Sequence, residues 1–335
     1  MTEPHQVAAT SPGRVNLIGD HTDVADGLVL PMAIDLATTV TGTRGGQFVE
    51  VTSADEPDIV RIDIDAADPL AASSGWGRYV AAVVAEVRPS TGFRGTVGTT
   101  LPVGAGLSSS AALEVSVALA LGFDGTPLEL AELCRRAEHR ASGVPCGIMD
   151  QLAVSAGVAG HALLIDCATR SIEPVPVPNG VEIRVIHSGQ KRRLAESGYA
   201  TRTAEVREAE ERIGPLREIA DPAAVADLEE PLRRRARHVI TENARVIEFA
   251  AALRRGDLAV AGEAMKASHR SLRDDYEVST DVLDSLVERL NGTPGVHGAR
   301  LTGAGFGGCV VALAEPGALT EGWLVRPSSG ASVSR

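Results

Sequence analysis

Residues 13–23 place an unusual density of polar side chains in one short stretch near the amino terminus. The stretch holds one cation, two carboxylates, an imidazole and a hydroxyl, contributed by Arg14, Asp20, Asp23, His21 and Thr22. Short donors and acceptors at this density suit a polyol, because each hydroxyl of such a ligand needs its own hydrogen-bond partner. The alternative is a solvated loop rich in Asx turns.

A second candidate for chemistry is Asp150, a carboxylate that follows the apolar residues Ile148 and Met149. A carboxylate in such surroundings needs a positioned cation to stay ionised at neutral pH, which is the state that a catalytic base requires. The same residue could instead cap the start of a helix over residues 151–156. Two interpretations are therefore open, a catalytic group and a helix cap.

A loop rich in glycine and serine, residues 101–112, follows a strand-like stretch and opens an almost wholly apolar helix expected to run to Leu121. Glycines let the backbone approach a ligand, and the start of a helix offers unpaired N–H groups and the positive end of the helix dipole. Ser108, Ser109 and Ser110 add hydroxyls for phosphate oxygens or magnesium. These features predict a phosphate cradle; the alternative is a turn with a serine cap before a core helix.

Two common nucleotide-binding patterns do not fit the chain. The loop lacks the lysine of a Walker motif. Asp124 lies twenty positions after Gly104, as in a dinucleotide fingerprint, but it precedes a helix cap instead of ending a second parallel strand. Residues 303–308 match G-x-G-x-x-G, yet they lead into a β-branched run. We expect them to form a tight loop that packs against a ligand or the first loop, with a plain hairpin turn as the alternative.

One helix that must position these groups is marked by its ends. Thr126 to Glu129 has the form of a capping box with proline at the first helical position, and Gly143 supplies a stop. These signals predict a helix of about 15 residues. Glu138 shares a face of that helix with small apolar residues, so its carboxylate needs a partner.

Strand signals alternate with helical stretches over roughly the first 180 residues. Val49 and Val51, and then Val60, Ile62 and Ile64, follow the period of two that half-buried strands show. This alternation predicts an α+β arrangement built on antiparallel sheet instead of a Rossmann series.

Three prolines within residues 174–178 precede an apolar run, and we place a domain junction near residue 180. The chain then divides into an amino-terminal domain, residues 1–180, and a carboxy-terminal domain, residues 181–335. Within the second domain we expect a strand at 183–186, charged helices over 199–218, 227–254, 258–273 and 278–290, and a closing strand over 309–313.

Composition excludes several classes of partner. Acidic residues outnumber basic ones 44 to 32 among 335 residues, giving a formal net charge of −12, which disfavours nucleic acid or an anionic membrane. The first ten residues lack the features of a signal peptide, and no long apolar run occurs, so a cytoplasmic protein with no membrane partner is expected. The four cysteines lack C-x-x-C spacing, which predicts reduced thiols and no zinc site.

Taken together, these segments resemble the galactokinase branch of the GHMP small-molecule kinases over nearly the whole chain. Residues 13–31 are similar to the galactokinase signature, residues 102–112 to the ATP loop of the family, and residues 301–308 to its third motif. Residues 76–80, 143–151 and 267–275 add further matches. The resemblance implies a two-domain GHMP kinase fold, with a ribosomal protein S5 domain 2-like amino-terminal domain and a ferredoxin-like carboxy-terminal domain.

The resemblance also implies roles for individual residues. Asp150 matches the catalytic aspartate that accepts the proton of the anomeric hydroxyl, and Arg14 matches the arginine that stabilises the transferring phosphoryl group. Ser110 and Glu138 match the ligands of Mg²⁺. The sugar-binding positions correspond to Asp20, His21, Thr22, Asp23, Gly147 and Tyr199. The ATP-binding positions correspond to Trp76, near the adenine, and to Gly104, Ala105, Gly106, Leu107, Ser108, Ser109 and Ser110.

The chain departs from the family pattern around the sugar. At residues 20–25 the usual Glu-His-Thr-Asp-Tyr-Asn becomes Asp-His-Thr-Asp-Val-Ala, which draws the first carboxylate back by one methylene, about 1.5 Å. A usual glutamate before Tyr199 is Gly198, and a usual second arginine is Thr203. We therefore expect either weaker galactose binding or a related acceptor.

The implied function is ATP-dependent phosphorylation of the C1 hydroxyl of a sugar, with D-galactose as the first candidate. ATP, Mg²⁺ and a small-molecule sugar are the expected ligands of a monomer or weak homo-oligomer. The alternatives are a kinase for N-acetylgalactosamine or arabinose, and a non-catalytic sugar-sensing relative. The segment 21–23 favours a sugar over mevalonate or homoserine, and the complete serine loop at 108–112 disfavours the sensor.

Overall fold

The structure is a computed structural model that describes residues 6–71, 73–102, 104–144, 146–190 and 195–334, with side chains from residue 198 onward in the last range. Val103 and Pro145, which belong to the expected phosphate loop and to the segment around Asp150, lie outside the described residues, as do residues 1–5. In the described part of the chain, no helix has both the length and the apolar character required to cross a bilayer.

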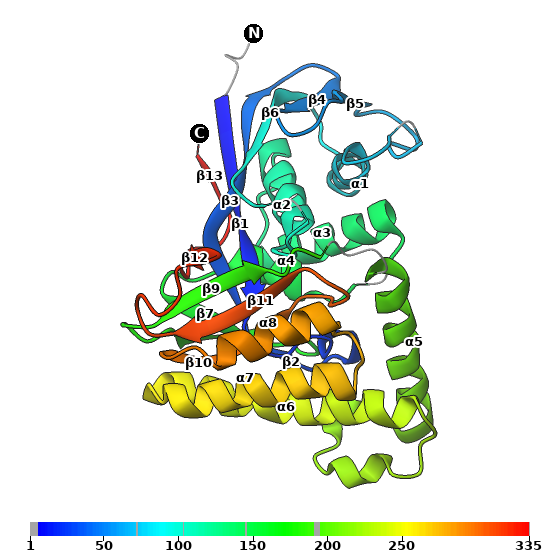
Figure 1. Ribbon diagram of the computed structural model, residues 1–335. Coiled ribbons are helices and arrows are strands. Elements are labelled where there is room, and N and C mark those ends of the chain that lie inside the picture. The colour runs from blue at the N-terminus through cyan, green and yellow to red at the C-terminus, as the bar shows by residue number, and fades with distance from the viewer. Residues whose placement is uncertain (1–5, 72, 103, 145, 191–194, 335) are drawn as a thin grey trace.

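A six-stranded sheet forms one end of the molecule (Figure 1). Its strands lie in the order β13 (Ser332–Ser334), β1 (Gln6–Asn16), β3 (Pro31–Arg44), β6 (Phe93–Thr99), β4 (Phe48–Ser53) and β5 (Val60–Asp63). Val49, Val51, Val60 and Ile62 are buried, as their spacing predicts. The pairs are antiparallel except β4 with β6, which corrects the expectation of a wholly antiparallel sheet. That pair is parallel because β5 and α1 (Gly77–Val87) carry the chain back before β6 begins.

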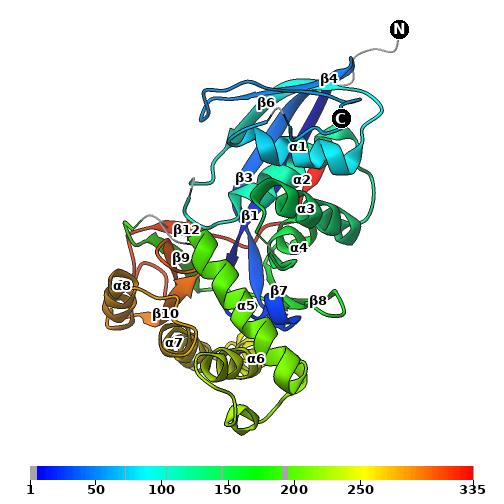
Figure 2. The same ribbon diagram turned by 90° about the vertical axis from the view of Figure 1, so that its right-hand side faces the viewer.

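Helices α1 to α4 lie on one face of this sheet (Figure 2). Helix α2 (Ser109–Leu121) ends at the predicted residue, and α3 (Pro127–Ser142) has the predicted capping box. Thr126 Oγ1 accepts a hydrogen bond from the Glu129 N–H at 3.3 Å, and Glu129 Oε2 accepts one from the Thr126 N–H at 2.7 Å. Gly143 closes α3 with a φ of 74°. Helix α4 (Met149–Ala156) follows.

A four-stranded antiparallel sheet forms the centre of the other end. Its order is β10 (Val296–Thr302), β11 (Cys309–Ala314), β9 (Glu182–His187) and β12 (Trp323–Val325). In Figure 1, α6 (Leu232–Arg255) and α7 (Leu258–Asp274) lie below this sheet, and α5 (Ala195–Ile213) stands to one side. Helix α8 (Asp281–Asn291) packs against β10 and β11. The predicted strands and helices of this region are confirmed, and with them the α+β class.

Several helix bounds differ from the prediction, and the two largest differences have identifiable reasons. Helix α5 ends at Ile213 instead of residue 218, because Gly214 adopts a φ of 88° and Pro215 follows it. Helix α6 begins at Leu232 instead of residue 227, after Pro231. The intervening segment forms two 3₁₀ helices, η2 (Leu216–Glu218) and η3 (Pro222–Val225).

The two ends of the molecule share a buried core. A third, small sheet has the order β2 (Leu28–Val29), β7 (His161–Asp166) and β8 (Ser171–Pro176), and two of the junction prolines lie in its edge strand β8. One buried cluster contains Val15 from β1 together with Val185 from β9 and Phe249 from α6. Strand β13 returns to pair with β1. The division near residue 180 stays a prediction.

Candidate active site

A cavity lies where the end of β1 meets the starts of α2 and α4, with α3, α5 and the loop after β10 completing its walls. Of the residues predicted from the sequence, it is lined by Arg14, Asp20, His21, Asp23, Ser110, Glu138, Gly147, Asp150 and Tyr199. Thr22 does not belong to this lining. Its buried Oγ1 lies 2.7 Å from the carbonyl oxygen of Leu28 and 2.9 Å from that of Gly19, so Thr22 shapes the loop.

Arg14 and Asp150 face each other in the cavity. Nε and Nη2 of Arg14 donate to the two carboxylate oxygens of Asp150, each at 2.7 Å, and Nη1 donates to the Gly106 carbonyl at 2.7 Å. Ser108 Oγ donates to Asp150 Oδ2 at 2.5 Å. Asp150 lies in the first turn of α4, whose N-cap is Ile148, so the helix-cap interpretation is wrong. Charged and forked hydrogen bonds fix the plane of the carboxylate.

Arg14 reaches this position because β1 is irregular just before it. The register with β3 shifts between Pro12 and Arg14. A Cβ atom at Gly13 would lie 2.6 Å from the Leu107 carbonyl oxygen, so a side chain there would push the loop away. Instead, the Arg14 N–H donates to that carbonyl at 3.1 Å. This backbone hydrogen bond holds the serine loop against β1, next to Asp150.

A second cavity adjoins the first, and Tyr79 and Ser110 line both. Trp76, just before α1, and Ser109 are the other predicted residues in its lining. The remaining loop residues lie outside both linings. Ala105 and Leu107 are buried in the core, whereas Gly104, Gly106 and Ser108 form the turn itself. The structure therefore brings Trp76, Ser109 and Ser110 together at the second cavity. The other predicted nucleotide residues, 104–108, lie outside the linings of both cavities.

The start of α2 has an uncommon geometry. Ser108 is the N-cap, with a left-handed φ of 56°, and its hydroxyl bonds to Asp150 instead of capping the helix. Within the described structure, the Ser108 side chain consequently does not cap the N–H groups of the first turn. Such groups, at the positive end of the helix dipole, are suited to an anion.

The residues predicted to hold Mg²⁺ fit such an ion. Among the described residues, Glu138 Oε2 has no hydrogen-bond partner although it is buried, and the carboxyl group lies within hydrogen-bonding reach of Ser110. Burial raises the pKa of Glu138 against the lowering effect of that hydrogen bond. Glu114, one turn after Ser110 on α2, lies beside Glu138, and burial raises its pKa well above the usual range. Hydroxyl and carboxylate oxygens are the ligands that Mg²⁺ prefers, with phosphates completing its shell.

The carboxylate of Asp20 is already paired with other groups of the protein. Its Oδ2 lies 2.6 Å from Nη1 of Arg300, and its Oδ1 accepts a hydrogen bond from the Gly303 N–H at 2.8 Å. Burial raises the pKa of Asp20, and the charge of Arg300 opposes this. Only 1% of Asp20 is exposed, so the shortened side chain lies deep in the cavity wall.

The His21 ring packs against two tyrosine rings. Its backbone has a left-handed φ of 67°, and its ring centroid lies 4.5 Å from that of Tyr276 and 5.5 Å from that of Tyr199. Burial lowers the pKa of His21 to about 3, so the ring is neutral at physiological pH. Its buried Nε2 has no hydrogen-bond partner within the described structure and is suited to a ligand hydroxyl.

Asp23 combines burial with two acidic neighbours. Burial, followed by the charges of Asp150 and Asp20, raises its pKa to about 7. A Cβ atom at Gly147 would collide with the Asp23 carboxylate, so the Gly147 backbone packs directly against that group. The two predicted sugar contacts thus form one surface.

Sequence reasoning missed several residues of this site. Tyr276 packs on His21, Arg300 pairs with Asp20, Glu114 adjoins Glu138, and Tyr79 joins the two cavities. Arg300 carried a usable signal, because it is a charged residue in the otherwise apolar strand β10. Glu114 carried the same kind of signal, as the one charged residue of α2, and Tyr79 lies within residues 76–80, which match the family pattern. Tyr276 carried no such signal.

The second glycine-rich segment, residues 303–308, is both a hairpin and a wall. It joins the antiparallel strands β10 and β11, and Gly303 and Ala304 line the cavity. Phe306 from this hairpin explains one departure from the family pattern. A Cβ atom at Gly198 would lie 2.5 Å from Phe306 Cζ, so the ring occupies the space of a side chain at 198. Thr203, the other departure, is buried.

Comparison with known proteins places this chain in a family. The description "Galactokinase galactose-binding signature" matches residues 2–44, "GHMP kinases N terminal domain" matches residues 78–158, and "GHMP kinases C terminal" matches residues 249–321. A galactokinase of Roseiflexus sp. (strain RS-1) is 44% identical, covering 93% of this chain and 84% of its own length. The Homo sapiens galactokinase is 42% identical, with 93% and 85% covered.

The architecture agrees with these matches. The crystal structure of Lactococcus lactis galactokinase complexed with galactose aligns with a TM-score of 0.91 and 33% identity, covering 98% of this chain and 95% of that one. A mevalonate kinase aligns with a TM-score of 0.66 and 20% identity, covering 93% and 92%, which shows the shared fold alone. The chain belongs to the galactokinase family of GHMP kinases.

Proposed function

We propose that this protein transfers the γ-phosphoryl group of ATP to the anomeric hydroxyl of D-galactose, yielding galactose 1-phosphate and ADP. The observation that carries the proposal is that one cavity is lined by Arg14 and Asp150, by the predicted sugar residues other than Thr22, and by Ser110 with Glu138. That cavity adjoins the one lined by Trp76. A sugar hydroxyl and a terminal phosphate can therefore meet in front of Asp150.

The chemistry follows from the groups at this junction. Asp150, held in one plane by Arg14 and Ser108, orients the sugar hydroxyl and accepts its proton as the new P–O bond forms and the bond to the β-phosphate breaks. Arg14 balances the charge of Asp150 and faces the phosphoryl group. Ser110 and Glu138 would hold Mg²⁺, which supplies neutralisation of phosphate charge.

On the sugar side, His21, Asp23 and Gly147 would contact the hydroxyls, with Tyr199 closing the pocket. On the nucleotide side, Trp76 would contact the adenine, and the turn at residues 104–110 would approach the phosphates through its backbone. We further propose that the chain divides into two domains at residue 180 and that the protein acts in the cytoplasm. We also propose that it is a monomer or a weak homo-oligomer, and light scattering would test this oligomeric state.

A related sugar is the second candidate, because Asp20 is shortened and paired with Arg300. The test is release of ADP from ATP and Mg²⁺ with a panel of galactose, N-acetylgalactosamine, arabinose and glucose. We expect the highest kcat/KM with galactose. A higher value with another sugar would reassign the substrate, and no ADP release with any sugar would refute kinase activity.

A further inference from the structure

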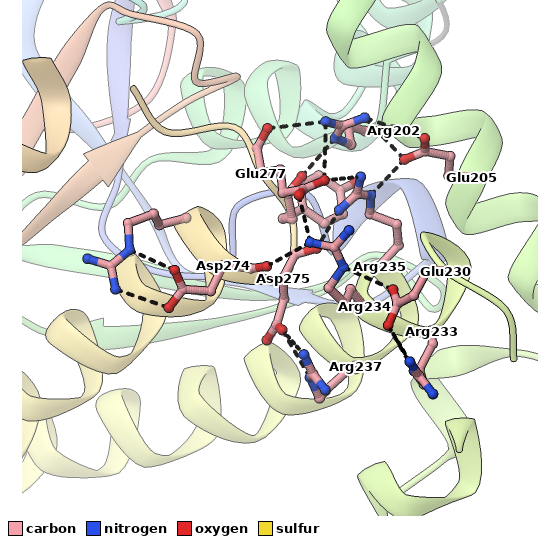
Figure 3. A network of polar contacts seen from close by, with 12 residues as sticks. Arg202, Glu205, Glu230, Arg233, Arg234, Arg235, Arg237, Asp274, Asp275 and Glu277 are labelled. Atoms are coloured by element: carbon pink, nitrogen blue, oxygen red, sulfur yellow. Dashed lines mark hydrogen bonds and ion pairs between the residues drawn. The ribbon is translucent and has the colours of Figure 1, made fainter. Parts of the chain in front are cut away.

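Residues 275–278, here called the strap, connect α7 to α8, and arginine side chains hold their backbone (Figure 3). Arg235 Nη1 donates to the Asp275 carbonyl at 2.6 Å. Arg202 donates through Nε to the Tyr276 carbonyl at 2.7 Å and through Nη2 to the Glu277 carbonyl at 3.2 Å. Three consecutive carbonyls thus find their partners in guanidinium groups instead of a helix or sheet.

Arg235 is the centre of this arrangement, and it is only 2% exposed. Its Nε donates to Glu205 Oε2 and its Nη2 to Glu277 Oε2, both at 2.6 Å. The guanidinium therefore joins α5, its own helix α6 and the strap (Figure 3). Glu277 has a left-handed φ of 55°, and Arg234 Nη1 also donates to it at 2.6 Å. The polar contacts hold the strap in a conformation that a non-glycine residue rarely adopts.

On its other side the strap supports the sugar wall of the cavity. The Tyr276 ring is fully buried and packs on His21, with a centroid distance of 4.5 Å, and on His238, at 4.6 Å. Because the Tyr276 ring packs directly on the His21 ring, a shift of the strap would move the surface on which the imidazole rests.

The strap also holds the glycine-rich hairpin that forms the opposite wall. The Val278 carbonyl accepts a hydrogen bond from the Phe306 N–H at 2.8 Å, and a Cβ atom at Gly305 would collide with that carbonyl. The same hairpin donates the Gly303 N–H to Asp20. The strap therefore helps to position two groups of the sugar site. It contacts the His21 imidazole through Tyr276, and it supports the Asp20 carboxylate through the hairpin.

We propose that Arg235 and Arg202 are positioning residues for the sugar half of the active site. They act through the strap on His21 and Asp20 and set the affinity for the sugar, while the nucleotide half is independent of them. The inference rests on the proposed function. It extends that function to residues that touch neither substrate.

The independence of the nucleotide half follows from its location. The lining of the second cavity runs from Thr38 to Leu113 and comes from β3, β4, β6 and the starts of α1 and α2. Arg235 lies on α6 and bonds to α5 and the strap. A general loss of stability would weaken both halves, whereas a shift of the strap would weaken the sugar half selectively.

The test substitutes lysine for Arg235. A single ammonium cannot replace three donors that point at three partners, so R235K should release the strap while keeping the charge. We expect the galactose Kd, measured by calorimetry without nucleotide, and the galactose KM to rise about 3- to 30-fold. The KM for ATP should stay within about twofold of the wild-type value.

The matched control is R233A on the same helix, because Arg233 pairs with the partly exposed Glu230. This variant should match the wild type in both constants. A second comparison combines R235K with Y276L. If both act through the strap, their effects on galactose Kd are less than additive.

Unchanged galactose affinity in R235K, equal losses of galactose and ATP affinity, or additive effects in the double variant would each overturn the inference. Where R235K does not fold, R202K frees only the Tyr276 and Glu277 carbonyls and gives the same readout. If the wild type binds galactose and the variants bind it with the same affinity, only the positioning role of Arg235 and Arg202 is rejected. A wild type that neither binds nor phosphorylates galactose rejects the proposed function and this inference together.

Discussion

The guanidinium of Arg14 bonds through two nitrogens to both carboxylate oxygens of Asp150, each at 2.7 Å, although 136 positions separate the two residues. The pairing joins strand β1 to the first turn of α4. Arg14 is nearly buried, whereas about a third of the Asp150 side chain is accessible. The carboxylate is therefore fixed from behind and open toward the cavity, as a group that orients a substrate hydroxyl must be.

Replacing Asp150 with asparagine should abolish most turnover while leaving nucleotide binding intact. The amide keeps the shape of the carboxylate but cannot take up a proton, and removal of a positioned base typically costs about 10²-fold or more in kcat. Steady-state ADP release and calorimetric binding of an ATP analogue give the two readouts. The exposed Asp124→Asn serves as the control. Near-normal kcat in D150N would refute the assignment.

Replacing Glu138 with glutamine should raise the concentration of Mg²⁺ required for half-maximal activity. The amide presents one neutral oxygen where the carboxylate presents an anionic one, which a hard cation prefers. Titration of Mg²⁺ at fixed ATP measures the change, and competition with Mn²⁺ followed by electron paramagnetic resonance reports binding without turnover. An identical Mg²⁺ dependence in E138Q and the wild type would remove Glu138 from the metal site.

Restoring glutamate at position 20 should lower the KM for galactose. The added methylene moves the carboxylate by about 1.5 Å, past its present pairing with Arg300 and toward the cavity. The sugar panel measured on D20E should also show greater selectivity for galactose over arabinose. If the KM for galactose does not move, Asp20 is not the contact that discriminates among sugars.

The raised pKa of Asp23 predicts that its contribution to the stability of the fold depends on pH. Because burial raises its pKa from 3.8 to about 7, the folded state holds the proton more tightly than the unfolded state does. Its contribution to the free energy of unfolding is therefore greatest below about pH 4 and falls as the pH rises to about 7. An asparagine side chain at this position cannot ionise, so D23N removes this loss.

The Tm of D23N minus that of the wild type should be larger at pH 8 than at pH 4.5. Thermal unfolding of the unliganded proteins at both pH values measures this difference, and other titrating groups cancel in the subtraction. An equal difference at the two pH values would show that Asp23 titrates normally.

Local signals in the sequence predicted single elements well. The capping box at Thr126 and the stop at Gly143 give the bounds of α3 to within a residue, because both act through contacts close in the chain. The end of α5 and the start of α6 were predicted wrongly although Gly214, Pro215 and Pro231, which interrupt helices, are visible in the sequence. The parallel pairing of β4 with β6 depends on a crossover that no local pattern specifies.

The site was predictable only in part. Chemistry alone marked Asp150 and the polar run at 13–23, but it could not show that Arg14 is the cation that Asp150 needs; the family resemblance supplied that pairing. Tyr276 remained hidden because its importance comes from packing against His21, 255 positions earlier in the chain. Contacts of this kind are set by the packing of helices, which spacing does not reveal.

Tyr79 and Ser110 border both cavities, so the two cavities lie next to each other. A nucleoside tethered to a hexose by a short linker could therefore occupy the whole space as one molecule. Because the second half would bind at a high effective concentration, such a conjugate should inhibit far more strongly than either fragment. It would also discriminate among kinases that share the nucleotide half of the fold but recognise different acceptors.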